Sequence, residues 1–101
     1  MAAKVLLALL LDVEDTAVTR QTAEALARVG TLAAVRLIAL ALAEADDSHA
    51  DWMQTGVDDA LAGADILPDV AAVCVQLAGD GEAAVRRAAV EILAWTGGAA
   101  R

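Results

Sequence analysis

Apolar residues recur along this chain at spacings of three and four positions, and no segment alternates cleanly between apolar and polar residues. Alanine and leucine, both strong helix formers, dominate these segments, so the pattern predicts helices and no strands. Short acidic or glycine-containing turns separate the segments. Six helices are predicted, over residues 2–11, 15–29, 32–45, 49–62, 68–78 and 82–96.

The predicted helix ends carry residues that favour starting or stopping a helix. Gly30 suits the left-handed conformation that follows a helix, and Pro68 suits a first turn because its missing N–H would have no acceptor there. Ser48 and Asp51 predict a capping box at the start of the fourth helix, with the Ser48 hydroxyl accepting from the Asp51 N–H. Asp80 is expected to cap the last helix in a similar way.

The second and sixth helices resemble each other when one is moved along the chain onto the other. The residues that coincide are Val18, Arg20, Glu24, Leu26, Ala27 and Gly30 with Val85, Arg87, Glu91, Leu93, Ala94 and Gly97. The fourth helix lies halfway between them, which gives a repeat of about 33–34 residues, a length typical of α-solenoids. Residues 1–101 are therefore expected to form a single domain, with hairpins over 1–30, 31–63 and 64–98.

Residues 80–93, Asp-Gly-Glu-Ala-Ala-Val-Arg-Arg-Ala-Ala-Val-Glu-Ile-Leu, resemble the turn and second helix of a HEAT-like repeat. In such a repeat an acid in the turn precedes a Val-Arg pair and an alanine-rich helix. Residues 15–26 are similar, with Thr19 in place of the first arginine. The resemblance implies an all-α fold, a short right-handed α-solenoid of three helical hairpins.

The same resemblance implies contacts between stacked hairpins. The turn acids Asp15 and Glu82 would neighbour Arg20 and Arg87. The middle hairpin departs from the pattern because it has no base at the arginine positions.

The second, fourth and sixth predicted helices are amphipathic. Their expected inward residues are Val18, Thr22, Ala25, Leu26 and Val29, then Met53, Val57, Ala60 and Leu61, and finally Val85, Ala89, Ile92 and Leu93. The other three helices are apolar nearly all round, since Lys4, Arg36 and Gln76 are their only interior charged or amide side chains. A helix of this kind is expected to be covered on all sides.

Two explanations are open for the outer ridges of the first, third and fifth helices. Alanine is small enough to be exposed without consequence, as many apolar surface atoms are. Alternatively, the ridges form an interface with a second chain. The second explanation predicts a homodimer, with possible self-association through Leu7, Leu11, Ala39 and Val75.

The chain carries 15 acidic residues against 7 lysines and arginines, for a formal net charge of -8, and the excess is concentrated. Residues 44–82 hold ten acids and no lysine or arginine. Several of these acids lie at predicted helix ends, where N-terminal carboxylates stabilise a helix. Asp58 and Asp59 lie inside the fourth helix, so a role in recognition or solubility is expected for them. An acidic chain is a poor ligand for nucleic acid phosphates, and no nucleic acid partner is expected.

No apolar stretch reaches the roughly 20 residues that a membrane span needs, because Arg36 interrupts the longest one, over residues 32–43. Residues 1–11 resemble the start of a secretory signal, but an acidic segment over 12–15 follows without a small-residue cleavage site. The interpretation is a buried helix. With one cysteine and no export signal, the protein is expected in the cytoplasm, away from membranes.

Candidate catalytic chemistry is sparse. Residues 46–51, Asp-Asp-Ser-His-Ala-Asp, resemble a metal or acid–base site, but no second histidine or cysteine lies at ligand spacing, so a solvated turn is favoured. Cys74 is expected in the core, because no base lies near it to lower its pKa. No enzyme activity, metal or cofactor is predicted.

The first hypothesis is therefore a non-enzymatic helical-repeat scaffold that binds a basic protein through its second, fourth and sixth helices. The candidate partner-binding residues are Asp51, Trp52, Thr55, Asp58, Asp59, Arg20 and Arg86. An aromatic side chain rimmed by carboxylates is typical of a binding hot spot, although the alignment of Trp52 with Val18 and Val85 favours a core position. One alternative is an immunity-type inhibitor or nucleic-acid mimic that blocks a basic toxin or nuclease site. Another is a HEAT-like enzyme or lyase subunit that positions a ligand.

Overall fold

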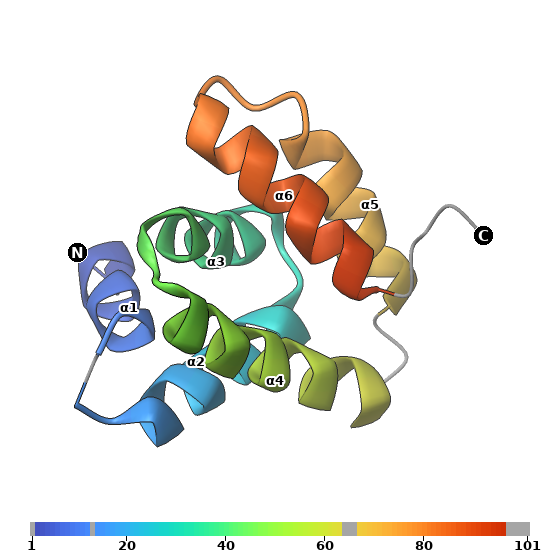
Figure 1. Cartoon of the computed structure of the whole chain (residues 1–101). Coiled ribbons are helices and arrows are strands. Elements are labelled where there is room, and N and C mark those ends of the chain that lie inside the picture. The colour runs from blue at the N-terminus through green and yellow to red at the C-terminus, as the bar shows by residue number, and fades with distance from the viewer. Residues whose placement is uncertain (1, 13, 64–66, 97–101) are drawn as a thin grey trace.

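The computed structural model describes residues 2–12, 14–63 and 67–96, which form six α-helices and no strand (Figure 1). The helices are α1 (Ala2–Leu10), α2 (Thr16–Val29), α3 (Leu32–Glu44), α4 (Asp47–Gly63), α5 (Leu67–Leu77) and α6 (Ala83–Trp95). Every boundary lies within two residues of its predicted position. The all-α prediction is confirmed.

Side-chain caps and one glycine define several helix ends. Asp15 accepts two backbone N–H groups of the first turn of α2, at 3.1 and 3.3 Å, and Gly30 ends that helix with a φ of 67°. Helix α4 begins two residues earlier than predicted because Asp46 accepts the backbone N–H of His49 at 2.8 Å. The predicted capping box at Ser48 is therefore wrong, since Asp46 occupies the capping position.

Helices α2 and α4 pack closely side by side along one edge of the molecule (Figure 1). Gly56 of α4 lies against the backbone of α2, where a Cβ atom would overlap the carbonyl oxygen of Arg20 and lie 3.0 Å from the Cβ of Ala23. The absence of a side chain at Gly56 lets the two helix backbones approach to a distance that no other residue would allow.

This close approach selects the face that α2 turns toward the core. The buried residues of α2 are Thr19, Ala23, Leu26 and Ala27. The prediction for α2 is confirmed only in part: Leu26 is buried and Val18 and Thr22 are half-buried, but Ala25 and Val29 are exposed, Val29 by 62%. Two neighbouring stripes of α2 are apolar, and the one with smaller side chains fits against Gly56. The predicted inward faces of α4 and α6 are confirmed, since all their residues are buried or half-buried.

Helix α3 lies at the centre, with α1, α2, α5 and α6 packed around it (Figure 1). Its buried residues are Ala34, Val35, Ile38, Ala39, Ala41 and Leu42. The prediction that an all-round apolar helix is covered is thus confirmed for most of α3, although Leu32 is 44% exposed and Ala33 and Ala43 are also exposed. It does not extend to α1 and α5, where Val5 is 58% and Val75 is 61% exposed.

The order in which the helices pack departs from a regular stack of hairpins. Helices α5 and α6 form a hairpin, and α1 contacts α2, but α3 and α4 contact each other little. Helix α6 lies mainly on α3 and only slightly on α4 (Figure 1). This packing does not confirm the predicted solenoid of three hairpins.

An ion-pair cluster joins α3 to the turn before α6. The Arg36 guanidinium donates to both carboxylate oxygens of Asp80, at 3.0 and 3.2 Å, and to Glu82 at 3.0 Å. These hydrogen bonds from Arg36 lower the pKa of Asp80. Asp80 was expected to cap α6, but Glu82 occupies the N-cap position, without a side-chain capping hydrogen bond, and Asp80 instead binds Arg36 and the Glu82 N–H.

Replacing Gly56 with alanine tests the α2–α4 contact. We expect Gly56→Ala to lower the free energy of unfolding by about 1–3 kcal/mol, because the added methyl forces the helices apart. The loss should occur although alanine favours a helix by ~1 kcal/mol over glycine. Urea denaturation followed by circular dichroism measures it. Gly81→Ala is the control, since a Cβ there meets no atom within 4 Å. A stabilised Gly56→Ala variant would contradict the assigned role.

Acid titration tests the Arg36–Asp80 pair. A carboxyl whose pKa is lower in the folded state stabilises the fold above its unfolded-state pKa, and the contribution is lost as the pH falls through the folded-state value. We therefore expect Asp80→Asn to be less stable than the wild type at neutral pH, with the difference shrinking below pH ~4. Urea denaturation at successive pH values gives both curves. A difference that stays constant with pH would show that the charge of Asp80 is not what stabilises the turn.

Candidate functional site

The outward side of α4 carries most of the predicted partner-binding residues. We call it the acidic face of α4, and its exposed residues are Asp51, Trp52, Thr55, Asp58 and Asp59. They occupy successive turns of one helix, so a single partner surface could contact all of them. Asp51, Thr55, Asp58 and Asp59 were predicted as partner-binding residues and are exposed, whereas a core position was favoured for Trp52.

Trp52 lies at the surface, with 39% of its area exposed, so the favoured core position was wrong. The buried stripe of α4 runs through His49, Met53, Val57 and Ala60. Trp52 precedes Met53 by one residue, which turns it by about 100° around the helix, away from that stripe. The alignment with other repeats failed because Gly56 fixes which side of α4 meets α2.

One ion pair lies at the edge of the acidic face. The Arg20 Nη1 atom of α2 donates to Asp59 Oδ2 at 2.9 Å, with both side chains partly exposed. Exposed pairs of this kind contribute about 0–1 kcal/mol, so this one mainly orients Arg20. Among the described residues, Asp51 and Asp58 form no ion pair. Partial burial, together with the charge of Asp59, raises the pKa of Asp58.

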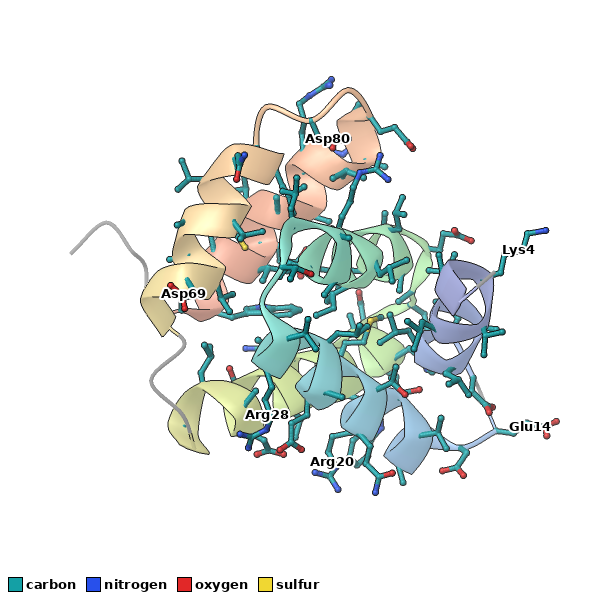
Figure 2. All side chains as sticks on the ribbon, turned by 180° about the vertical axis from the view of Figure 1, so that it is seen from behind. Lys4, Glu14, Arg20, Arg28, Asp69 and Asp80 are labelled. Carbon is teal, nitrogen blue, oxygen red and sulfur yellow. The ribbon has the colours of Figure 1, made fainter. Side chains whose placement is uncertain are left out.

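Arg86 lies apart from the acidic face, contrary to the prediction. Its Nη1 atom donates to the backbone oxygen of Asp80 at 2.7 Å. Figure 2 shows Asp80 and Arg20 at opposite ends of the molecule. Because α6 packs on α3, the second, fourth and sixth helices do not bring these two arginines into one groove.

The acid–arginine neighbours implied by the HEAT-like resemblance take other partners. Arg20 pairs with Asp59, and Glu82 pairs with Arg36 at 3.0 Å. Asp15 caps α2. The ion pairs therefore join α2 to α4 and α3 to the α5–α6 turn.

The predicted self-association residues do not share a surface. Ala39 is fully buried in the core of the domain, so its assignment to a self-association surface is wrong. Leu7 and Leu11 are half-buried against the core, and Val75 is exposed on α5. Helices α1 and α5 lie on opposite sides of α3 (Figure 1).

Sequence reasoning also missed an apolar groove between α1 and α2. It has a volume of about 410 Å³ and is lined by Leu6, Gln21, Thr22, Ala25, Leu26 and Val29. Most of these α2 residues were expected to face the core. The apolar stripe that these residues form on α2 was the sequence feature that could have indicated the groove. The stripe stays partly exposed because α2 packs against α4 with its smaller residues.

His49 is buried, with 6% of its surface exposed, so the prediction of a solvated turn is wrong for this residue. Its Nε2 atom lies 2.7 Å from the Leu10 carbonyl oxygen and 3.0 Å from Thr19 Oγ1. A carbonyl oxygen only accepts, so Nε2 carries the proton. His49 thereby joins the end of α1 to α2 and α4. These partners lie 39 and 30 residues away in the chain, so no local pattern indicated them.

The described residues offer little for catalysis or metal binding. Cys74 is fully buried, as predicted, and burial raises its pKa to about 11, which keeps it in the unreactive thiol form. Within residues 2–12, 14–63 and 67–96, no group of three or more histidine, cysteine or acidic side chains could hold a metal ion.

No helix in the described part of the chain is both long and apolar enough to cross a membrane. Comparison of the chain with protein-family models, with curated proteins and with solved structures finds no match.

Proposed function

We propose that this chain is a non-enzymatic, HEAT-like helical-repeat module that binds a basic protein through the acidic face of α4. The observation that carries the proposal is the exposure of Trp52 on the same helix face as Asp51, Asp58 and Asp59.

Charge supports the proposal. Residues 44–82 hold ten acids without a lysine or arginine, and three of those acids lie on the acidic face. Arg20 pairs with Asp59 at the edge, and the charges of Asp51 and Asp58 stay available to a partner. Complementary charge attracts a basic surface, speeds its encounter and makes binding weaken as salt rises.

Trp52 supplies an apolar contact for such a partner. Tryptophan is among the residues most enriched in binding hot spots, because it buries a large area and loses little conformational entropy. Its exposed 39% is available for contact with a partner.

The contacts of α4 with α1 and α2 hold the acidic face in place before any partner binds. Gly56 lies against the backbone of α2, and His49 hydrogen bonds to α1 and α2. A preorganised surface loses less entropy on binding. The HEAT-like part of the proposal is supported by residues 80–93 and by the side-by-side packing of α2 and α4, a contact that second helices of successive hairpins make in a solenoid.

Affinity capture from the native lysate at low and high salt, followed by mass measurement, tests the function. We expect Asp51→Lys combined with Asp58→Lys to reduce capture of the salt-sensitive partner by about tenfold or more, because it reverses the charge while leaving the Arg20–Asp59 pair intact. Trp52→Ala should cause a similar loss.

The matched control is Glu14→Lys combined with Glu91→Lys, which changes the net charge equally at exposed positions outside the acidic face. It is expected to retain the partner. If both α4 variants capture the same proteins as the wild type, the acidic face is not the binding surface.

A further inference from the structure

A pocket of about 310 Å³ opens where α1 and α3 end and α4 begins. It is lined by Leu11, Glu44, Ala45, Asp46 and His49. The three helix ends lie close together in Figure 1. None of these residues belongs to the acidic face, although Trp52 lies less than one turn of α4 beyond His49.

His49 contributes a buried nitrogen to this pocket. Its Nε2 atom is engaged by the Leu10 carbonyl oxygen and Thr19, while Nδ1 forms no hydrogen bond to the described residues. In the described part of the chain, every fully buried side-chain nitrogen or oxygen has a hydrogen-bond partner. Because Nδ1 has no such partner, it is not fully buried. His49 lines the pocket, and the Nδ1 atom of an imidazole that carries its proton on Nε2 is a hydrogen-bond acceptor.

The other polar groups of the pocket are also acceptors. Glu44 and Asp46 contribute carboxylates, and one oxygen of Asp46 is already used by the His49 N–H. Helices α1 and α3 both end beside the pocket, so the negative ends of their dipoles lie near it. The N-terminus of α4 is positive, and Asp46 compensates for it as the cap. Residues 37–85 include no lysine or arginine.

We propose that this pocket binds the cationic side chain of a lysine or arginine on the protein partner. A group that only donates hydrogen bonds matches the acceptor side chains of the pocket, and a positive charge matches the two carboxylates and the two helix C-termini. Leu11 and Ala45 supply apolar walls for the aliphatic part of such a side chain. The assignment to a partner side chain rests on the proposed function. The preference of the pocket for a cation follows from its own residues and does not depend on the proposed function.

Nuclear magnetic resonance of the whole chain tests the pocket without any partner. The chain has one histidine, so a nitrogen-15 spectrum of the imidazole ring reports on His49 alone. We expect the free protein to show the Nε2-protonated form. Titration with n-butylammonium and n-butylguanidinium chloride should shift the His49 ring and Leu11 methyl signals to saturation, with dissociation constants on the order of 1–10 mM. n-Butanol and sodium chloride are the ligand controls.

Glu44→Gln is expected to weaken butylammonium binding about tenfold, while Glu91→Gln, at an exposed position on α6, leaves it unchanged. Asp46→Asn should also weaken binding, and asparagine still caps α4. Equal shifts with n-butanol, a proton on Nδ1, or unaltered binding by Glu44→Gln would overturn the site.

Capture of the protein partner separates the two proposals. We expect Glu44→Gln to reduce capture as well, by a smaller factor than the double replacement on the acidic face. If butylammonium binds but Glu44→Gln captures the partner like the wild type, the cation is not a partner side chain, and the proposed function is unaffected. If the pocket binds butylammonium while the acidic-face variants capture normally, the proposed function fails and the pocket remains.

Discussion

The approach of α4 to α2 at Gly56 is the contact on which much of the remaining structure depends. With no side chain at Gly56 between the backbones, α4 meets α2 at the small residue Ala23. This spacing brings His49 within hydrogen-bonding distance of Thr19 and the end of α1. It also fixes the rotation of α4 about its axis, which turns Trp52 and the acids outward. One glycine thus links core packing to the chemistry of the surface.

A second constraint comes from α3 and its one internal charge. Helix α3 is apolar on nearly all sides, so burying it requires neighbours all round, and α6 supplies part of that cover. Arg36 forms ion pairs with Asp80 and Glu82, which hold the turn before α6 beside α3. Because α6 covers α3, it covers little of α4. The acidic face is therefore left exposed.

The two candidate sites differ in how far the sequence could reveal them. The acidic face lies on one helix, so the spacing of Asp51, Thr55 and Asp58 and the charge excess of their segment were sufficient to find it. The pocket at His49 is formed by three helix ends that are distant in the chain, and no local pattern indicates which ends meet. Arg86 was grouped with the acidic face for a related reason, since periodicity gives the side of a helix and not its neighbour.

The sequence by itself determined the six helices, the glycine that ends α2, the inward faces of α4 and α6, and the concentration of acids in the middle of the chain. These features depend on interactions between residues that lie only a few positions apart in the sequence. Only the tertiary structure decided which of two apolar stripes on α2 is buried, that Ala39 lies in the core, and that Trp52 and Val29 are exposed. Those outcomes depend on how closely two backbones approach, and the overlap that a Cβ at Gly56 would cause is a property of both helices together.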